Sequence, residues 1–138
     1  MALYLADSSI WSWAAEGERP DLEAKLAERF GRGEIVTCPP VVLEVMHRVG
    51  GGAEYEALYG ELFDPLLEIP LSADGGERAK GVQRGLAGSA AESHRLPATD
   101  FLIAACAETH ETPITLWFFD RDLEMICAYT GQSHEAES

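Results

Sequence analysis

Residues 2–11 read ALYLADSSIW, an apolar run that ends at Asp7 and is followed by two serines. Leu3–Ala6 is apolar at every position, which is typical of a short strand buried on both faces in a parallel sheet covered by helices. Ser8 or Ser9 can cap a helix that begins near Ile10. The stretch therefore predicts a buried strand, a junction at Asp7 and a helix.

The rest of the chain repeats this alternation of strand and helix. Further strands are expected at residues 35–38, 67–71 and 113–119, and helices at residues 20–31, 41–49, 55–63, 74–93, 97–107 and 120–129. The alternation favours a single-domain, three-layer α/β/α sandwich with a short, mostly parallel sheet. The domain is expected to span residues 1–131. Residues 132–138 form a polar, acidic tail that is expected to be disordered.

Composition narrows the classes of protein that this chain can be. Its 138 residues are 46% hydrophobic and 25% charged, as in an ordinary globular domain. No apolar stretch approaches the ~20 residues that cross a bilayer, and no signal peptide is recognisable, so no membrane association is expected. Cys38, Cys106 and Cys127 lack a metal-ligand spacing and are expected to be buried thiols in the cytoplasm. The net charge of −14 disfavours direct contact with nucleic acid unless bound cations face the phosphates.

Acidic residues stand where apolar runs meet the next element. Asp7 closes the first predicted strand, Asp120 closes the strand at residues 113–119, and Asp100 lies in the first turn of an apolar helix. Carboxyl ends of parallel strands meet at one edge of the sheet, where ligands bind in open α/β folds. Glu44 lies in an apolar helix and either faces this edge or interrupts an apolar face. Carboxylates gathered there would form an oxygen-only site for Mg²⁺ or Mn²⁺.

Each of these residues also has a simpler interpretation. Asp7 can cap a helix, Asp100 can complement a helix dipole, and Glu44 can be a solvated helix position. Asp120 and Asp122 can cap the last helix. Tryptophans at 11, 13 and 117 are expected in the core or an interface rather than as base-stacking platforms.

Four acidic motifs resemble those of PIN-domain nucleases, particularly VapC-type toxins. They occur in the same order and at similar spacing, as LADSSIW at 5–11, VLEV at 42–45, LPATDFLIAACA at 96–107 and DRDLEMI at 120–126. The resemblance implies a PIN-like fold and a Mg²⁺- or Mn²⁺-dependent endoribonuclease. It also implies a homodimer silenced by a small basic antitoxin, with operator DNA bound only through that antitoxin.

The resemblance also implies residue roles. Asp7, Glu44, Asp100 and Asp120 would be the catalytic, metal-binding quartet, and Asp122 an auxiliary metal ligand. Trp117-Phe118-Phe119 departs from the family, which often has a small polar residue before the final acidic motif, so Asp120 and Asp122 compete for the fourth position. By their positions in the sequence, Arg84, Arg95 and Arg121 are the basic residues expected near phosphate.

Two other functions stay open from the sequence. One is a PIN-fold binding module with little nuclease activity, which complexes a basic antitoxin and regulates its operon. The other is a metal-dependent phosphatase that acts on small phosphate esters. The sequence lacks a glycine-rich phosphate loop and the Asp-x-Asp pattern of aspartyl phosphatases after its first strand.

Overall fold

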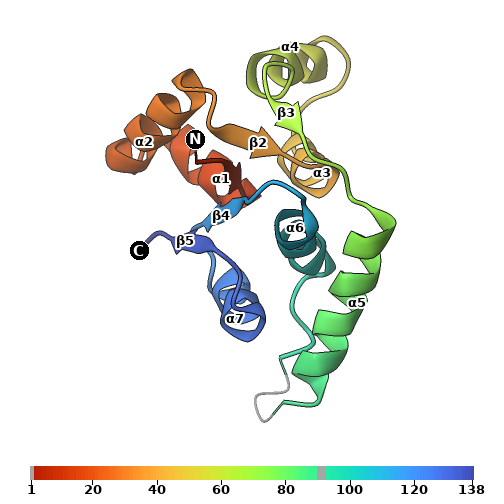
Figure 1. The fold of residues 1–138 in the computed structure, drawn as a ribbon. Coiled ribbons are helices and arrows are strands. Elements are labelled where there is room, and N and C mark those ends of the chain that lie inside the picture. Colours follow the sequence, from red (N-terminus) through yellow and green to blue (C-terminus); the bar gives the residue numbers. More distant parts are fainter. Residues whose placement is uncertain (1, 90–92) are drawn as a thin grey trace.

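A parallel sheet forms the centre of the protein (Figure 1). The computed structural model describes residues 2–89 and 93–138. Within them the sheet has five strands in the order β3-β2-β1-β4-β5, and each neighbouring pair is parallel. The strands are β1 (Tyr4–Ala6), β2 (Ile35–Thr37), β3 (Leu67–Glu68), β4 (Thr115–Phe118) and β5 (His134–Ala136). The predicted parallel α/β sheet is confirmed.

Seven helices connect these strands in the described residues. They are α1 (Ser8–Glu16), α2 (Pro20–Gly31), α3 (Pro39–Met46), α4 (Ala53–Leu62), α5 (Ala73–Ala87), α6 (Ala98–Thr109) and α7 (Arg121–Thr130). Right-handed crossovers place α1–α4 on one face of the sheet and α5–α7 on the other. Helix α1 packs on α2, and α6 packs on both α5 and α7, as this division requires. Helix α3 also contacts α6. The strand order therefore reverses between β1 and β4, which is where ligands bind in such folds.

Several helix boundaries differ from the predicted ones. Helix α1 is capped by Asp7, whose Oδ2 accepts a hydrogen bond from the Ser9 backbone N–H at 3.1 Å, so the helix begins at Ser8 and not near Ile10. Helix α3 begins two residues early because its two prolines fit the first turn, which needs no backbone donors. Helix α5 ends at Ala87, and part of the predicted extension to residue 93 lies outside the described residues.

The prediction of a disordered tail is wrong for residues 134–136. These residues form β5, which pairs with β4 in the register Leu116↔His134 to Phe118↔Ala136. The acidic side chains that suggested fraying are paired with cations of α2. Glu135 contacts Lys25 at 2.8 Å and Arg29 at 2.9 Å, and Glu137 contacts Lys25 at 2.6 Å. Backbone pairing and neutralised charge together hold the tail on the sheet edge.

The core lies between the sheet and both helix layers. Its largest fully buried side chains include Trp117, Phe118, Leu5 and Ile10. The three cysteines are buried and free, as predicted. No helix in the described parts of the chain is long and apolar enough to cross a membrane.

Candidate metal centre

Asp7 sits at the carboxyl end of β1, directly beside the end of β4. Its backbone N–H donates to the Trp117 carbonyl at 2.9 Å, so the β1–β4 pairing continues up to the junction. Asp7 is 1% exposed, and its carboxylate accepts from the Ser9 backbone N–H at 3.1 Å and the Ser9 hydroxyl at 2.7 Å. Asp7 is thus a helix cap, and it also holds a carboxylate at the reversal point of the sheet.

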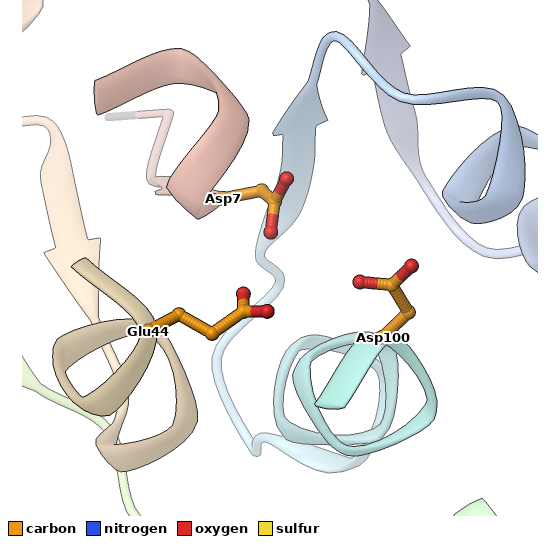
Figure 2. Close-up of side chains that lie close together, drawn as sticks. All are labelled: Asp7, Glu44 and Asp100. Carbon is orange, nitrogen blue, oxygen red and sulfur yellow. The ribbon is translucent and has the colours of Figure 1, made fainter. Parts of the chain in front are cut away.

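Glu44 on α3 reaches into the same space (Figure 2). Its Oε1 accepts from the Ser8 hydroxyl at 2.7 Å, and its Oε2 accepts from the Thr99 hydroxyl at 2.9 Å. Glu44 therefore joins the first turns of α1 and α6 and is not a solvated helix position. Sequence reasoning missed both hydroxyl partners, although each one is the immediate neighbour of a predicted acidic residue, Asp7 or Asp100.

Asp100 is a buried carboxyl group whose charged form is disfavoured by its surroundings. It is 4% exposed, and its Oδ2 is buried without a hydrogen-bond partner among the described residues. Burial, together with the negative charges of Asp120, Asp7, Glu44 and Asp122, raises its pKa to about 8. Burial also raises the pKa of Asp7 to about 6, against the opposing hydrogen bonds from Ser9.

The five predicted carboxyl groups form two overlapping trios. Asp7, Glu44 and Asp100 offer oxygens that lie within 4.8 Å of one another, and so do Asp100, Asp120 and Asp122. Figure 2 shows the first trio converging from the junction between β1 and α1, from α3 and from α6. Asp120 also caps α7, because its Oδ1 accepts from the Asp122 backbone N–H at 2.7 Å. Asp100 belongs to both trios and lies at the centre of the cluster.

The aromatic run before Asp120 does not exclude that residue from the cluster. Trp117 and Phe118 are buried in the core, while Phe119 stacks on Trp13 with the ring centroids 5.1 Å apart. The Phe119 backbone N–H donates to the Ser9 hydroxyl at 2.9 Å, and this ties the end of β4 to the Asp7 junction. The three aromatic side chains that depart from the family pattern therefore pack into the core or against Trp13 and leave Asp120 within the cluster.

Comparison with known proteins identifies the family. The model of the PIN domain matches residues 4–128. The chain belongs to the PIN-domain family. It is 34% identical over 134 residues to Ribonuclease VapC18 of Mycobacterium tuberculosis, covering 96% of this chain and 93% of that one. The resemblance to VapC-type PIN domains is thereby confirmed.

Solved structures agree on the fold of this PIN domain. A chain in the crystal structure of DNA-bound VapBC from Salmonella typhimurium matches with a TM-score of 0.75 at 12% identity, covering 99% of this chain and 98% of that one. A chain in VapBC2 from Rickettsia felis, bound to a promoter DNA fragment, matches with a TM-score of 0.71 at 17% identity, covering 99% of both. At these identities the likeness concerns the fold alone.

The donor set of this PIN domain fits a hard divalent cation. The cluster offers carboxylate oxygens, the ligands that Mg²⁺ and Mn²⁺ prefer. A cation would give the orphaned Asp100 Oδ2 a partner and would neutralise the repulsion that raises the pKa values of Asp7 and Asp100. The residues present therefore fit such an ion.

Some basic side chains lie beside the carboxylate cluster, and others lie elsewhere on the surface. His47 and Arg48 line a hollow of about 250 Å³ together with Glu44 and Ser8. Arg121 directly follows Asp120. Arg84 lines a separate hollow on α5, whose lining contains none of the five carboxylates. Arg95 is exposed in the segment before α6.

Proposed function

We propose that this PIN-domain protein is a Mg²⁺- or Mn²⁺-dependent endoribonuclease and the toxin of a VapBC-like pair. The observation that carries the proposal is the convergence of four other carboxyl groups on Asp100 at the reversal point of the sheet. Identity to a protein named as a VapC ribonuclease supports RNA as the substrate. The RNA and the antitoxin would both be met in the cytoplasm.

Asp7, Glu44, Asp100 and Asp120 would hold the cation, with Asp122 as an auxiliary ligand. When bound, Mg²⁺ or Mn²⁺ supplies positive charge that polarises a phosphoryl oxygen and lowers the pKa of water. Asp120 is favoured over Asp122 as the fourth ligand, because its charge acts more strongly on Asp100. Asp122 stays within reach through the second trio.

The surrounding residues fix these carboxylates in place. Ser9 orients Asp7 by donating two hydrogen bonds, while Ser8 and Thr99 each hold one oxygen of Glu44. Such outer contacts fix ligand orientation and typically change metal affinity by roughly 10- to 100-fold when removed. Burial of Asp7 and Asp100 limits the water that would screen a bound cation.

The test is cleavage of a single-stranded RNA by purified, antitoxin-free protein. We expect cleavage with Mg²⁺ or Mn²⁺, none in chelator, and none by Asp100→Asn in either buffer. Exposed Asp64 lies outside the cluster, so Asp64→Asn is the matched control and should cleave normally. A folded wild type that binds its antitoxin but leaves RNA intact would favour the binding module. Turnover of a generic phosphate ester without RNA cleavage would favour a phosphatase.

We infer that the partner is a basic antitoxin and that the toxin is a homodimer. The net charge of −14 supports attraction to a basic protein, and two similar structures are of VapBC bound to DNA. Operator DNA would then be bound only through the antitoxin. Light scattering of the toxin alone should give twice the mass of one chain. DNA retardation should appear only after the antitoxin is added.

A further inference from the structure

A hollow of about 510 Å³ opens beside Asp120, on the side of the metal centre away from Glu44. Its wall is formed by α1, the end of β4, the start of α7 and the segment that ends β5. We call it the α1–α7 hollow, and its lining includes Trp13, Phe119, Asp120, Arg121, Glu124 and residues 136–138. Asp120 thus borders both the hollow and the candidate metal centre. Its size lies within the roughly 300–1,000 Å³ of small-molecule sites.

Two aromatic rings give the hollow a flat, apolar wall. Trp13 and Phe119 are stacked, with their centroids 5.1 Å apart and an interplanar angle of 20°. Both are only partly buried, whereas Trp11 and Trp117 lie in the core at 6% and 0% exposure. The Arg19 guanidinium lies 5.2 Å from the centre of the Phe119 ring. A partly exposed aromatic side chain next to the proposed cleavage site can stack on an unpaired base of single-stranded RNA.

Two charged side chains at the hollow are free to act on a ligand. Arg121 and Glu124 are exposed, and neither side chain has a hydrogen bond or ion pair within residues 2–89 and 93–138. Glu137 is different, because its Oε1 is held by Lys25 at 2.6 Å and by the Trp117 indole N–H at 2.9 Å. Among the acidic side chains that line this hollow in the described residues, Glu124 is therefore the unpaired one apart from the proposed metal ligand Asp120.

We propose that the α1–α7 hollow binds the base of the nucleotide next to the scissile phosphate. The base stacks on the face of the Trp13 ring that Phe119 does not cover, and Glu124 accepts a hydrogen bond from its exocyclic amino group. Arg121 contacts the adjoining phosphate. Carboxylates recognise amino groups such as cytosine N4, whereas uracil presents a carbonyl oxygen at the same place. The inference rests on the proposed ribonuclease function and adds a base preference to it.

The first test separates stacking from general packing. Trp13→Leu removes the ring but keeps an apolar side chain, and Trp13→Phe keeps a ring that can stack. On single-stranded oligoribonucleotides we expect Trp13→Leu to raise KM by about 5- to 150-fold, the effect of losing one stacked base, and Trp13→Phe to restore most of it. Equal melting temperatures for the two variants would exclude a folding defect.

The second test reads base preference. In a randomised RNA library, wild type should prefer cytidine over uridine at one position beside the cut. Glu124→Gln should lose that preference, because an amide can both donate and accept. Glu68→Gln, an exposed change on the opposite edge strand β3, is the control and should keep it. Unchanged KM in Trp13→Leu with unchanged preference in Glu124→Gln would overturn the proposal.

A third measurement works without cleavage and so separates the two hypotheses. Trp13 is partly exposed, whereas Trp11 and Trp117 are buried, so its fluorescence should be quenched by cytidine 5′-monophosphate more than by uridine 5′-monophosphate. Trp13→Phe should abolish the quenching. Wild type that fails to cleave RNA but shows this quenching would refute the ribonuclease assignment and retain the base site. Cleavage without quenching by either nucleotide would refute the base site alone.

Discussion

Replacing Asp100 with asparagine should stabilise the metal-free protein, and increasingly so as the pH rises. Burial and four neighbouring carboxyl groups raise the pKa of Asp100 from its ordinary 3.8 to about 8. Between these values the folded protein holds a proton that the unfolded chain has lost, so rising pH lowers the free energy of unfolding. Asparagine is neutral at every pH, so the free energy of unfolding of Asp100→Asn does not fall for this reason.

The size of the expected stability difference follows from the raised pKa of Asp100. Each pKa unit corresponds to about 1.4 kcal/mol, and a range from about pH 5 to about pH 7 lies inside the window for Asp100. The stability difference between Asp100→Asn and wild type should therefore grow by as much as about 3 kcal/mol across that range. Part of this is shared with Asp7, whose raised pKa of about 6 lies in the same window.

Urea denaturation in chelator, followed by circular dichroism at several pH values, measures this difference. Asp64→Asn removes an exposed carboxyl group outside the cluster, and its difference from wild type should stay flat. Millimolar Mn²⁺ should then stabilise wild type but not Asp100→Asn, because a cation that binds only the folded state adds to its stability. A pH-independent difference for Asp100→Asn would refute the electrostatic account of the cluster.

Three further changes test how the site and the tail are held. Asp7→Asn keeps an oxygen that can cap α1 and Asp7→Ala does not, so thermal denaturation should show Asp7→Ala to be the less stable by about 1 kcal/mol. Thr99→Val removes the hydroxyl that donates to Glu44 Oε2 at 2.9 Å, and calorimetric titration should show Mn²⁺ affinity lowered by roughly 10-fold or more. Glu135→Gln leaves Lys25 and Arg29 without a shared carboxylate, and urea denaturation should show a loss of about 1–3 kcal/mol.

Each of these predictions has an outcome that contradicts it. Equal stability of the two Asp7 variants would remove the capping role. Mn²⁺ affinity in Thr99→Val equal to that in the exposed control Thr112→Val would mean that the hydroxyl does not orient Glu44. A Glu135→Gln variant as stable as the exposed control Glu111→Gln would mean that the Glu135 ion pairs do not help to hold the tail on the sheet.

The sequence predicted the parts of the fold in which local pattern and burial coincide. The first strand is buried and ends at Asp7, so its apolar run and its polar terminator were both visible. Asp100 was found because it interrupts an otherwise apolar helix at its first turn. The cap of α1 was assigned to the following serines, because the carboxylate of Asp7 has two roles and the sequence suggests each separately.

What the sequence did not predict depends on contacts between distant residues. Strand β5 is polar and acidic, and it is stable because β4 lies beside it and α2 supplies Lys25 and Arg29. The bonds from Ser8 and Thr99 to Glu44 span 36 and 55 residues. The α1–α7 hollow likewise needs α1, α7 and the tail in one place, and a disordered tail would have left it without a wall.

RNA cleavage by wild type and Asp100→Asn, compared side by side with Mn²⁺ and with chelator, decides whether a carboxylate-held metal drives the reaction. We expect cleavage in a single combination, wild type with Mn²⁺, and a stably folded Asp100→Asn that is inactive in both buffers. Cleavage by Asp100→Asn at the wild-type rate, or cleavage by wild type that persists in chelator, would contradict a carboxylate-held metal as the source of activity.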